Sequence, residues 1–223
     1  MQETDALINL CKMKTHALER VTGGVKNLYG CISGLHKAKG HTKYTNADIF
    51  ARQLIDLNQL IKPRFCVMDG IVAMDGNGPT SGDPVKMKVL LLGNDPVAID
   101  SVYCHLVHLD PQMVPTNVHG ETMGLGTWRE ENIRLLTDGG EITMQEAVER
   151  FGNPDFNVDR KKQRGNLWNR FNNGFLRYFQ KKPYIEEDKC KKCGVCVEAC
   201  PVEGKALQFK NGRRKPPVYN YHK

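Results

Sequence analysis

The chain has 223 residues, of which 40% are hydrophobic and 26% charged, and its formal net charge is +7. No apolar run approaches the roughly 18 residues that cross a bilayer, and the N-terminal residues lack the pattern of a signal peptide, which argues against a membrane-spanning or secreted protein. The length suits one sizeable domain with a smaller one, and we expect a cytoplasmic location.

The basic charge is concentrated near the C-terminus. Residues 160–223 contain 17 Lys and Arg against five Asp and Glu. A basic region of this kind favours an acidic redox partner protein. Nucleic acid is the less favoured ligand, because the region matches no known nucleic-acid-binding motif.

The first predicted elements are a strand and two helices. Residues 5–11 form an apolar run too short for a helix, which indicates a buried strand. The Gly-, Lys- and Thr-rich segment that follows predicts a loop that turns into a short helix at about residues 26–32. Asn46 is placed to cap a helix with apolar residues on one face, and Pro63 ends it.

The middle of the chain predicts two more strands and another helix. Residues 64–68 are the second strand, and the Gly, Pro, Asp and Asn that follow over residues 71–84 are typical of a loop. Residues 85–92 are the third strand, and three consecutive leucines within it predict cover on both faces. Asp95 is the expected N-cap of a helix that runs to about Leu109.

A fourth short strand is expected at residues 133–136. Thr143 and Glu146 form a capping box that begins a helix ending at Phe151. Because strands and helices alternate along the chain, we expect an α/β fold with a mostly parallel sheet flanked by helices.

The C-terminal part predicts a small ferredoxin-like α+β module, in which a hairpin turns at Asn211 and Gly212. The expected domains are an α/β domain at 1–151, a connector at 152–183 and the module at 184–223.

The module contains the most specific motif of the sequence, a C-x2-C-x2-C-x3-C-P run like that of bacterial ferredoxins. Two-residue gaps let one tight loop present three thiolates to adjacent corners of a cubane cluster, and Gly194 eases the turn. A zinc site is the alternative, although zinc ribbons normally use two separated cysteine pairs. The expected ligands of a 4Fe-4S cluster are Cys190, Cys193, Cys196 and Cys200.

The number of clusters depends on the fourth cysteine of the run. In two-cluster ferredoxins it binds the other cluster, so Cys200 is expected to serve a second site, and the intact protein carries one or two clusters. No cysteine follows Cys200, which suggests that the chain is truncated at its C-terminus. The alternative is that a distant cysteine completes the cluster, although isolated cysteines are more often small buried side chains. The distant candidates are Cys11, Cys31, Cys66 and Cys104.

Four further motifs occur in order over about residues 5–140, before the module. They are the segments at 9–16, 21–30 and 94–100, and Asp69-Gly70 followed by Gly76-Asn77-Gly78-Pro79. With these motifs the chain resembles the domain of unknown function 362 family, many members of which are fused to a ferredoxin domain. The resemblance implies an α/β fold without an established activity. It also implies further N-terminal residues, whose absence would leave an unpaired sheet edge that favours association with another chain.

Polar residues of these motifs gather at or after predicted strand ends, where open α/β sheets bind ligands. A small anionic substrate would suit the lysines, and His16 is the candidate general base. The alternative is that the lysines are solvated, that His16 contacts backbone, and that Asp100 pairs with a helix neighbour. The candidates are Lys12, Lys14 and Lys26 for substrate binding and His16, Asp69 and Asp100 for catalysis.

Three functional hypotheses follow. The first is electron transfer through 4Fe-4S clusters to a reaction in the α/β domain, as in an oxidoreductase or oxidoreductase subunit, or to a partner protein. The second is a partner-recognition or maturation subunit with a ferredoxin-like carrier module and no catalytic pocket. The third is a nucleic-acid-binding protein in which the clusters are structural, and steeply salt-dependent binding would support it.

Overall fold

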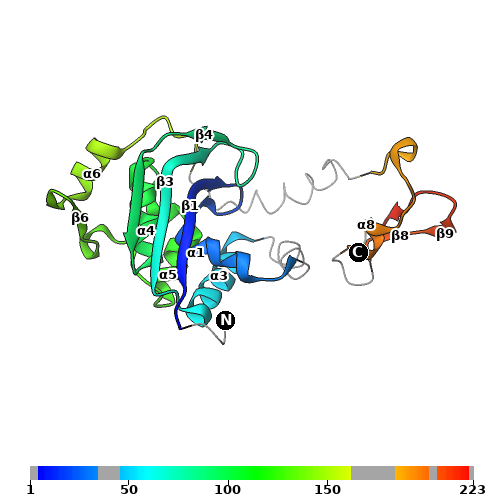
Figure 1. The fold of residues 1–223 in the computed structure, drawn as a ribbon, viewed down its shortest axis with the longest axis horizontal. Helices are drawn as coiled ribbons and strands as arrows, with labels where there is room; N and C mark the ends of the chain where they lie inside the picture. Colours follow the sequence, from blue (N-terminus) through cyan, green and yellow to red (C-terminus); the bar gives the residue numbers. More distant parts are fainter. Residues whose placement is uncertain (1–4, 35–45, 162–183, 201–204, 221–223) are drawn as a thin grey trace, which may run out of the picture. The chain divides into compact units, whose positions relative to one another are not determined.

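The chain is described from a computed structural model that covers residues 5–34, 46–161, 184–200 and 205–220 (Figure 1). It divides into a first unit of residues 1–32 and 44–161 and a second unit of residues 33–43 and 162–223. Most of the expected connector, residues 162–183, lies outside the described residues.

The first unit is built on a five-stranded sheet. Its strands are β1 (Ile8–His16), β2 (Arg20–Thr22), β3 (Phe65–Asp75), β4 (Asp83–Val85) and β5 (Val89–Gly93). β3 is central, pairing in parallel with β1 and antiparallel with β4 and β5, while β2 pairs antiparallel with β1.

The sheet is therefore mixed, and the expected parallel pairing is confined to β1 and β3. Helices separate these two strands in the sequence and allow the crossover that parallel strands require. The connections from β1 to β2 and from β3 to β4 are short and contain no helix, so the chain reverses direction at both of them. β4 and β5 then follow one another in the same direction along β3.

β1 and β3 both extend beyond their predicted ends. β1 continues to His16 because Met13 and Thr15 are buried while the side chains between them point to the other face. β3 passes through Gly70, which we expected to end the strand. A Cβ atom at Gly70 would lie 2.8 Å from Cγ2 of Val89 and 3.0 Å from Cε of Met13, so this glycine permits close packing within the strand.

The helices follow the local capping signals. They are α1 (Gly24–Asn27), α3 (Ala47–Ile61), α4 (Pro96–Leu106), α5 (Pro115–Thr122) and α6 (Met144–Phe151), with 3-10 turns η1 (Leu28–Cys31), η2 (Pro111–Met113) and η3 (Glu130–Asn132). The predicted N-caps Asn46, Asp95 and Thr143 all accept hydrogen bonds from the first turn of their helices. α4 ends three residues earlier than predicted, and α5, which contains Gly120 and begins with a proline, was not predicted.

The strand predicted at 133–136 is present with a shift but does not join the main sheet. It is β6 (Leu135–Thr137), which forms a separate two-stranded sheet with β7 (Gly140–Ile142). A two-residue turn joins the two strands and forces antiparallel pairing.

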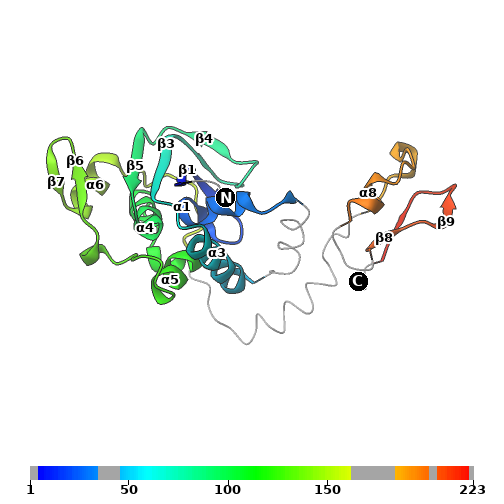
Figure 2. The same cartoon turned by 60° about the horizontal axis from the view of Figure 1, so that its bottom comes forward.

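The core of the first unit lies between the sheet and its helices, which Figure 2 shows on one side of the sheet. Met13 and Met68 of the sheet are fully buried there, as is Tyr103 of α4. The other face of the sheet is open. Leu90 and Leu92 are 50% and 60% exposed on it, so the prediction that the three leucines are covered on both faces is wrong.

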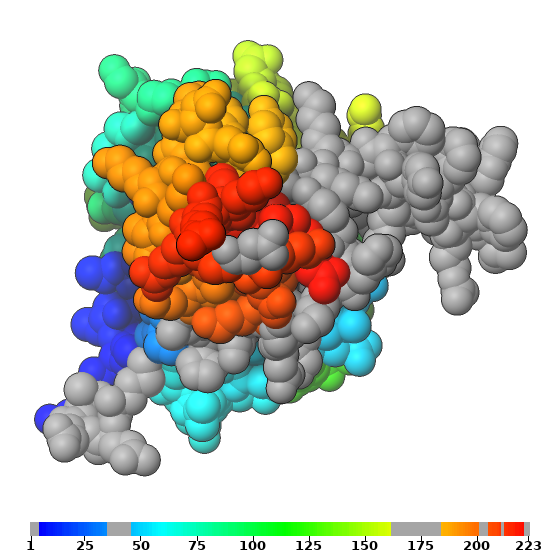
Figure 3. Space-filling view, turned by 90° about the vertical axis from the view of Figure 1, so that its right-hand side faces the viewer, coloured from blue at the N-terminus to red at the C-terminus, as the bar shows by residue number. Residues whose placement is uncertain are grey.

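The second unit contains short elements only. They are η4 (Glu187–Lys189), α8 (Val195–Glu198), β8 (Leu207–Gln208), β9 (Lys210–Arg213) and β10 (Val218–Tyr219), shown in orange and red in Figure 3. β8 and β10 pair antiparallel, as expected for the predicted hairpin. The turn predicted at Asn211 and Gly212 is wrong, because both residues lie in β9. Across both units, no described helix has the length and apolar character needed to cross a bilayer.

Candidate functional sites

The four cysteines of the ferredoxin-like run lie around α8. Cys190 follows η4, and Gly194 precedes α8 with a φ of +86°, a backbone conformation that glycine adopts without strain. Cys193 and Cys196 are exposed, and Cys190 and Cys200 are half-buried. Cys190, Cys193 and Cys196 are free thiols and thus available to a metal.

The donor set fits an iron–sulfur cluster, since thiolates are the ligands that such clusters use. The described residues hold no group of three or more His, Cys, Asp or Glu side chains close enough to bind a metal ion together. The backbone therefore forms the turn that carries the cysteines. Bonds to the metal are then needed to bring their sulfur atoms together.

A cationic side chain lies against this cysteine run. A Cβ atom at Gly194 would lie 3.1 Å from Nη2 of Arg213 and 3.6 Å from Cε2 of Phe209. Lys192 Nζ donates a 2.8 Å hydrogen bond to the carbonyl of Arg214. The β9 segment thus places a guanidinium group beside the turn that carries the thiols.

The other cysteines lie in the first unit. Cys11, Cys66 and Cys104 are buried, which confirms the expectation of small buried side chains, while Cys31 is exposed. The Sγ atoms of Cys11 and Cys66 are 3.8 Å apart. This hydrogen bond and burial raise the pKa of the Cys11 thiol well above its ordinary value, so Cys11 stays protonated.

Lys12 and Asp69 form an ion pair on the open face of the sheet. Lys12 Nζ donates to Asp69 Oδ2 at 2.7 Å, and both side chains are 42% exposed. The hydrogen bond from Lys12 and another from the Ile71 backbone lower the pKa of Asp69, so this carboxylate remains ionised. Lys14 lies two residues further along the same face of β1.

His16 lines a small hollow at the carboxyl end of β1. The hollow holds about 180 Å³ and is also lined by Thr15, Arg20, the Gly76–Gly78 loop and Asp159. His16 Nδ1 accepts hydrogen bonds from the backbone N–H groups of Leu18 and Glu19 at 3.2 and 3.1 Å. In the neutral ring the proton is therefore on Nε2, which makes His16 a donor at that atom.

The glycine motif of residues 76–79 allows the loop to pack closely against β1 and to form one side of this hollow. A Cβ atom at Gly78 would lie 2.2 Å from the carbonyl oxygen of Thr15. Only glycine lets the loop approach the end of β1 this closely. Arg20 is nine-tenths buried, donates to the carbonyls of Met113 and Asp159 and pairs with the Asp159 carboxylate at 3.1 Å.

Asp100 lies on the covered side of the sheet. Its carboxylate accepts hydrogen bonds from the backbone N–H groups of Gly24 at 2.5 Å and Val25 at 3.1 Å, and thus holds the start of α1. Burial raises its pKa to about 7, although both hydrogen bonds oppose this increase. A Cβ atom at Gly23 would lie 2.2 Å from Asp100 Oδ1, which explains the Gly-Gly pair.

Lys26 is on the same covered side, with Nζ 5.9 Å from the ring centre of Phe50. The six sequence-predicted residues therefore lie in three places. Lys12, Lys14 and Asp69 share the open face, His16 lines the end hollow, and Lys26 and Asp100 lie among the helices.

Glu19 is a notable residue that the sequence reasoning missed. It is fully buried, and neither carboxylate oxygen has a hydrogen-bond partner among the described residues. Burial raises its pKa to about 8; the charge of Lys26 opposes this rise and that of Asp48 adds to it. Its position beside His16 is set by the turn from β1 to β2, which no sequence pattern predicts.

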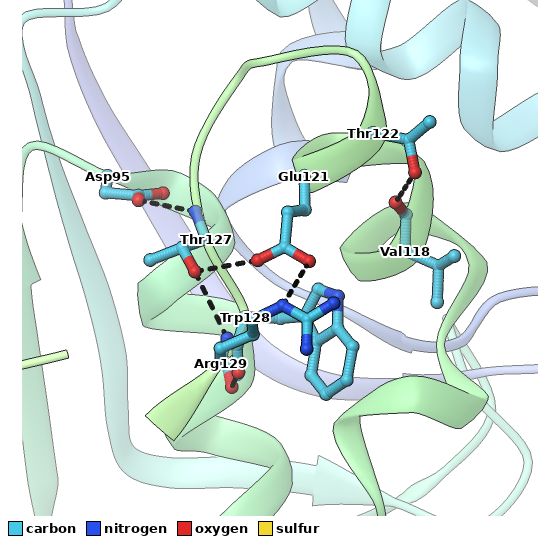
Figure 4. A network of polar contacts seen from close by, with 8 residues as sticks. Asp95, Val118, Glu121, Thr122, Thr127, Trp128 and Arg129 are labelled. Carbon is cyan, nitrogen blue, oxygen red and sulfur yellow. Dashed lines mark hydrogen bonds and ion pairs between the residues drawn. The ribbon is translucent and has the colours of Figure 1, made fainter. Parts of the chain in front are cut away.

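A polar network holds the loop after α5, and sequence reasoning also missed it (Figure 4). Glu121 accepts hydrogen bonds from Thr127 Oγ1 and Arg129 Nε, both at 2.9 Å, and Asp95 Oδ2 accepts from Thr127 N. The Arg129 guanidinium lies 5.0 Å from the ring centre of Trp128. Asp95 and Thr127 line a second hollow of about 480 Å³ between β5, α4 and β6.

Comparisons with known proteins agree with the sequence motifs. Residues 1–105 match the family described as domain of unknown function (DUF362), and residues 183–204 match the 4Fe-4S binding domain. A curated relative, the thylakoid-associated protein sll1697 of Synechocystis, is 40% identical over 143 residues. That match covers 64% of this chain and 44% of the relative, so the chain spans less than half of the relative's length. No solved structure matches.

Proposed function

We propose that the chain transfers electrons through an iron–sulfur cluster, because residues 1–105 match the DUF362 family and residues 183–204 match the 4Fe-4S binding domain. The observation that carries this proposal is the spacing of the four cysteines at 190–200. When bound, such a cluster supplies reversible one-electron transfer.

In this proposal Cys190, Cys193 and Cys196 bind one cluster through adjacent corners. The αL conformation of Gly194 supports the tight turn between them. Cys200 follows after three residues, the position whose thiolate in two-cluster ferredoxins belongs to the other cluster. The iron content per chain therefore distinguishes one cluster from two.

The chain's own residues also bear on partner choice. The excess of Lys and Arg over residues 160–223 favours an acidic redox partner, because opposite charges steer the encounter. A cytoplasmic location suits an iron–sulfur protein, because the reducing cytosol keeps cysteines as thiols. The name of the Synechocystis relative makes a thylakoid-bound redox partner the first to test.

Two roles remain for the first unit. The hollow beside His16 supports an oxidoreductase that binds a small anionic substrate, with His16 as a hydrogen-bond donor at Nε2 and Arg20, which is paired with Asp159, as a buried cation. The separation of the six candidate residues into three places favours the second role, a partner-recognition or maturation subunit. A direct binding assay with small dicarboxylates or phosphate distinguishes the two.

The cluster proposal is tested by anaerobic reconstitution of the full chain with iron and sulfide. We expect the wild-type chain to turn brown and to retain iron and sulfide in about equal amounts. Cys193→Ser removes a proposed ligand and should lose most of both. Lys191→Ser is the matched control, because Lys191 is exposed in the same segment but is not a cysteine.

Two results would contradict the proposal. One is a colourless wild-type chain that holds zinc or no metal after the same treatment. The other is equal iron loading of both serine variants. Nucleic-acid binding that weakens steeply with salt would instead support the third hypothesis.

A further inference from the structure

The helices of the first unit lie on one side of the main sheet (Figure 2). The open face on the other side carries an apolar patch. The large apolar side chains of β1, β3 and β5 on this face are between 38% and 69% exposed. We define the open-face patch by five of them, namely Ile8, Leu10, Phe65, Leu90 and Leu92.

The patch is continuous across the three strands. Ile8 is paired with Phe65, and Leu10 is paired with Val67, which is in turn paired with Leu92. Cross-strand neighbours on one face lie roughly 5 Å apart, so these side chains touch or nearly touch. The result is one apolar surface rather than scattered exposed residues.

The exposed area of the patch is comparable with that of the apolar core of a protein–protein interface. A fully exposed leucine, isoleucine or phenylalanine has an area of roughly 200 Å², so these exposures amount to roughly 500 Å² of residue surface. That lies near the top of the range for the largest patch on a monomer. With a rim of neighbouring residues it approaches the roughly 800 Å² per partner of a stable interface.

We propose that the open-face patch is the contact between two copies of this chain, packed face to face in a two-fold dimer. The proposal goes beyond electron transfer and does not depend on it. Two sheets pack with their faces roughly 10 Å apart, and alternating side chains from both fill the space. A sheet surface is already ordered before contact, so little conformational entropy is lost.

The charges on this face define the orientation. The Lys12–Asp69 ion pair and Lys14 lie toward the carboxyl end of β1, beyond the apolar side chains of Ile8 and Leu10. A two-fold axis that crosses the strands superposes the apolar ends of the two copies. The same axis carries Lys14 of each copy to opposite rims, which avoids repulsion between like charges.

The self-complementary character of the patch is the reason for choosing a second copy as its occupant. No charged side chain lies within the five residues, so apolar surface meets apolar surface in an isologous contact. An anionic bilayer is the rival occupant. It suits this face less well, because Asp69 neutralises Lys12 beside the patch.

The test is the mass of the full chain in solution, measured by light scattering after size exclusion from about 1 to about 100 μM. We expect twice the 25.2 kDa chain mass at the higher concentrations. Leu10→Lys and Leu92→Lys, on different strands, should each weaken the dimer at least tenfold. Leu60→Lys is the matched control, because Leu60 is 80% exposed on α3, and should leave the dimer unchanged.

Circular dichroism verifies that each variant folds, and the wild-type mass decides the question even where a variant does not. A wild-type chain that is monomeric at about 100 μM would overturn the proposal. So would a dimer that resists both patch variants or that Leu60→Lys disrupts equally. Binding of the monomeric chain to anionic vesicles, lost in both patch variants, would assign the face to a membrane instead.

Discussion

Replacing Glu19 by glutamine should make the first unit more stable at alkaline pH. Glutamine has nearly the same shape as glutamate but carries no charge. The Glu19 carboxylate has no hydrogen-bond partner among the described residues, so the substitution removes no described interaction. What it removes is the cost of holding a charge in a buried site.

The size of the effect follows from the pKa of Glu19, which burial raises from 4.5 to about 8. The folded chain retains a proton that the unfolded chain loses. This contribution to stability is therefore complete below pH 4.5 and declines as the pH rises to about 8. At about 1.4 kcal/mol per pH unit, the decline is about 5 kcal/mol in total and about 3 kcal/mol between pH 5.5 and pH 9.

The assay is chemical denaturation of the wild type and Glu19→Gln at about pH 5.5 and about pH 9. The advantage of the variant should grow by about 3 kcal/mol between the two conditions. Asp100 also titrates in this range, with a pKa of about 7, but it does so in both proteins and cancels from the comparison. Glu131→Gln, at an exposed site, is the control and should show no growing advantage. Parallel pH dependence of the wild type and Glu19→Gln would refute the reasoning.

Two further substitutions test other features. Gly78→Ala should destabilise the first unit by about 2 kcal/mol or more, because its Cβ would lie 2.2 Å from the Thr15 carbonyl. Gly139→Ala, whose Cβ would meet only Thr137 Oγ1 at 3.7 Å, should change the unfolding midpoint little, and equal losses would contradict this account. In the reconstituted chain, Arg213→Gln should lower the reduction potential by tens of millivolts in redox titrations, because a nearby cation stabilises the reduced cluster. No change would show that the guanidinium does not act on the cluster.

The helix starts were predictable because their chemistry is local. Asn46, Asp95 and Thr143 are residues whose side chains accept hydrogen bonds from the first turn of a helix, and all three do so. The cysteine run is local in the same sense, since its spacing alone indicates the family of metal site.

The sheet was harder to predict because its faces are not separated by polarity. The covered face of β1 carries Asn9 and Thr15, while the open face carries Ile8 and Leu10 at one end and Lys14 toward the other. This pattern lacks the regular alternation of apolar and polar residues that is typical of a strand with one buried face. The direction of β5 was also not predictable, because it depends on connections whose turns carry no distinct signal.

The candidate residues show that membership of one sequence motif does not place side chains in one site. Lys12, Lys14 and His16 share one face of β1, as alternation along a strand requires. Asp100 was chosen for its motif, yet it lies inside the helical layer and holds the start of α1. Whether a carboxylate in such a motif faces a ligand or a backbone depends on packing across the sheet, which a single sequence does not encode locally.

The most direct test of electron transfer is electron paramagnetic resonance of the reconstituted full chain before and after chemical reduction. We predict a silent oxidised state and a reduced state with the low-temperature signal of a one-electron-reduced 4Fe-4S cluster, lost in Cys193→Ser. A chain that binds iron and sulfide but gives the same spectrum before and after reduction would contradict the proposed function.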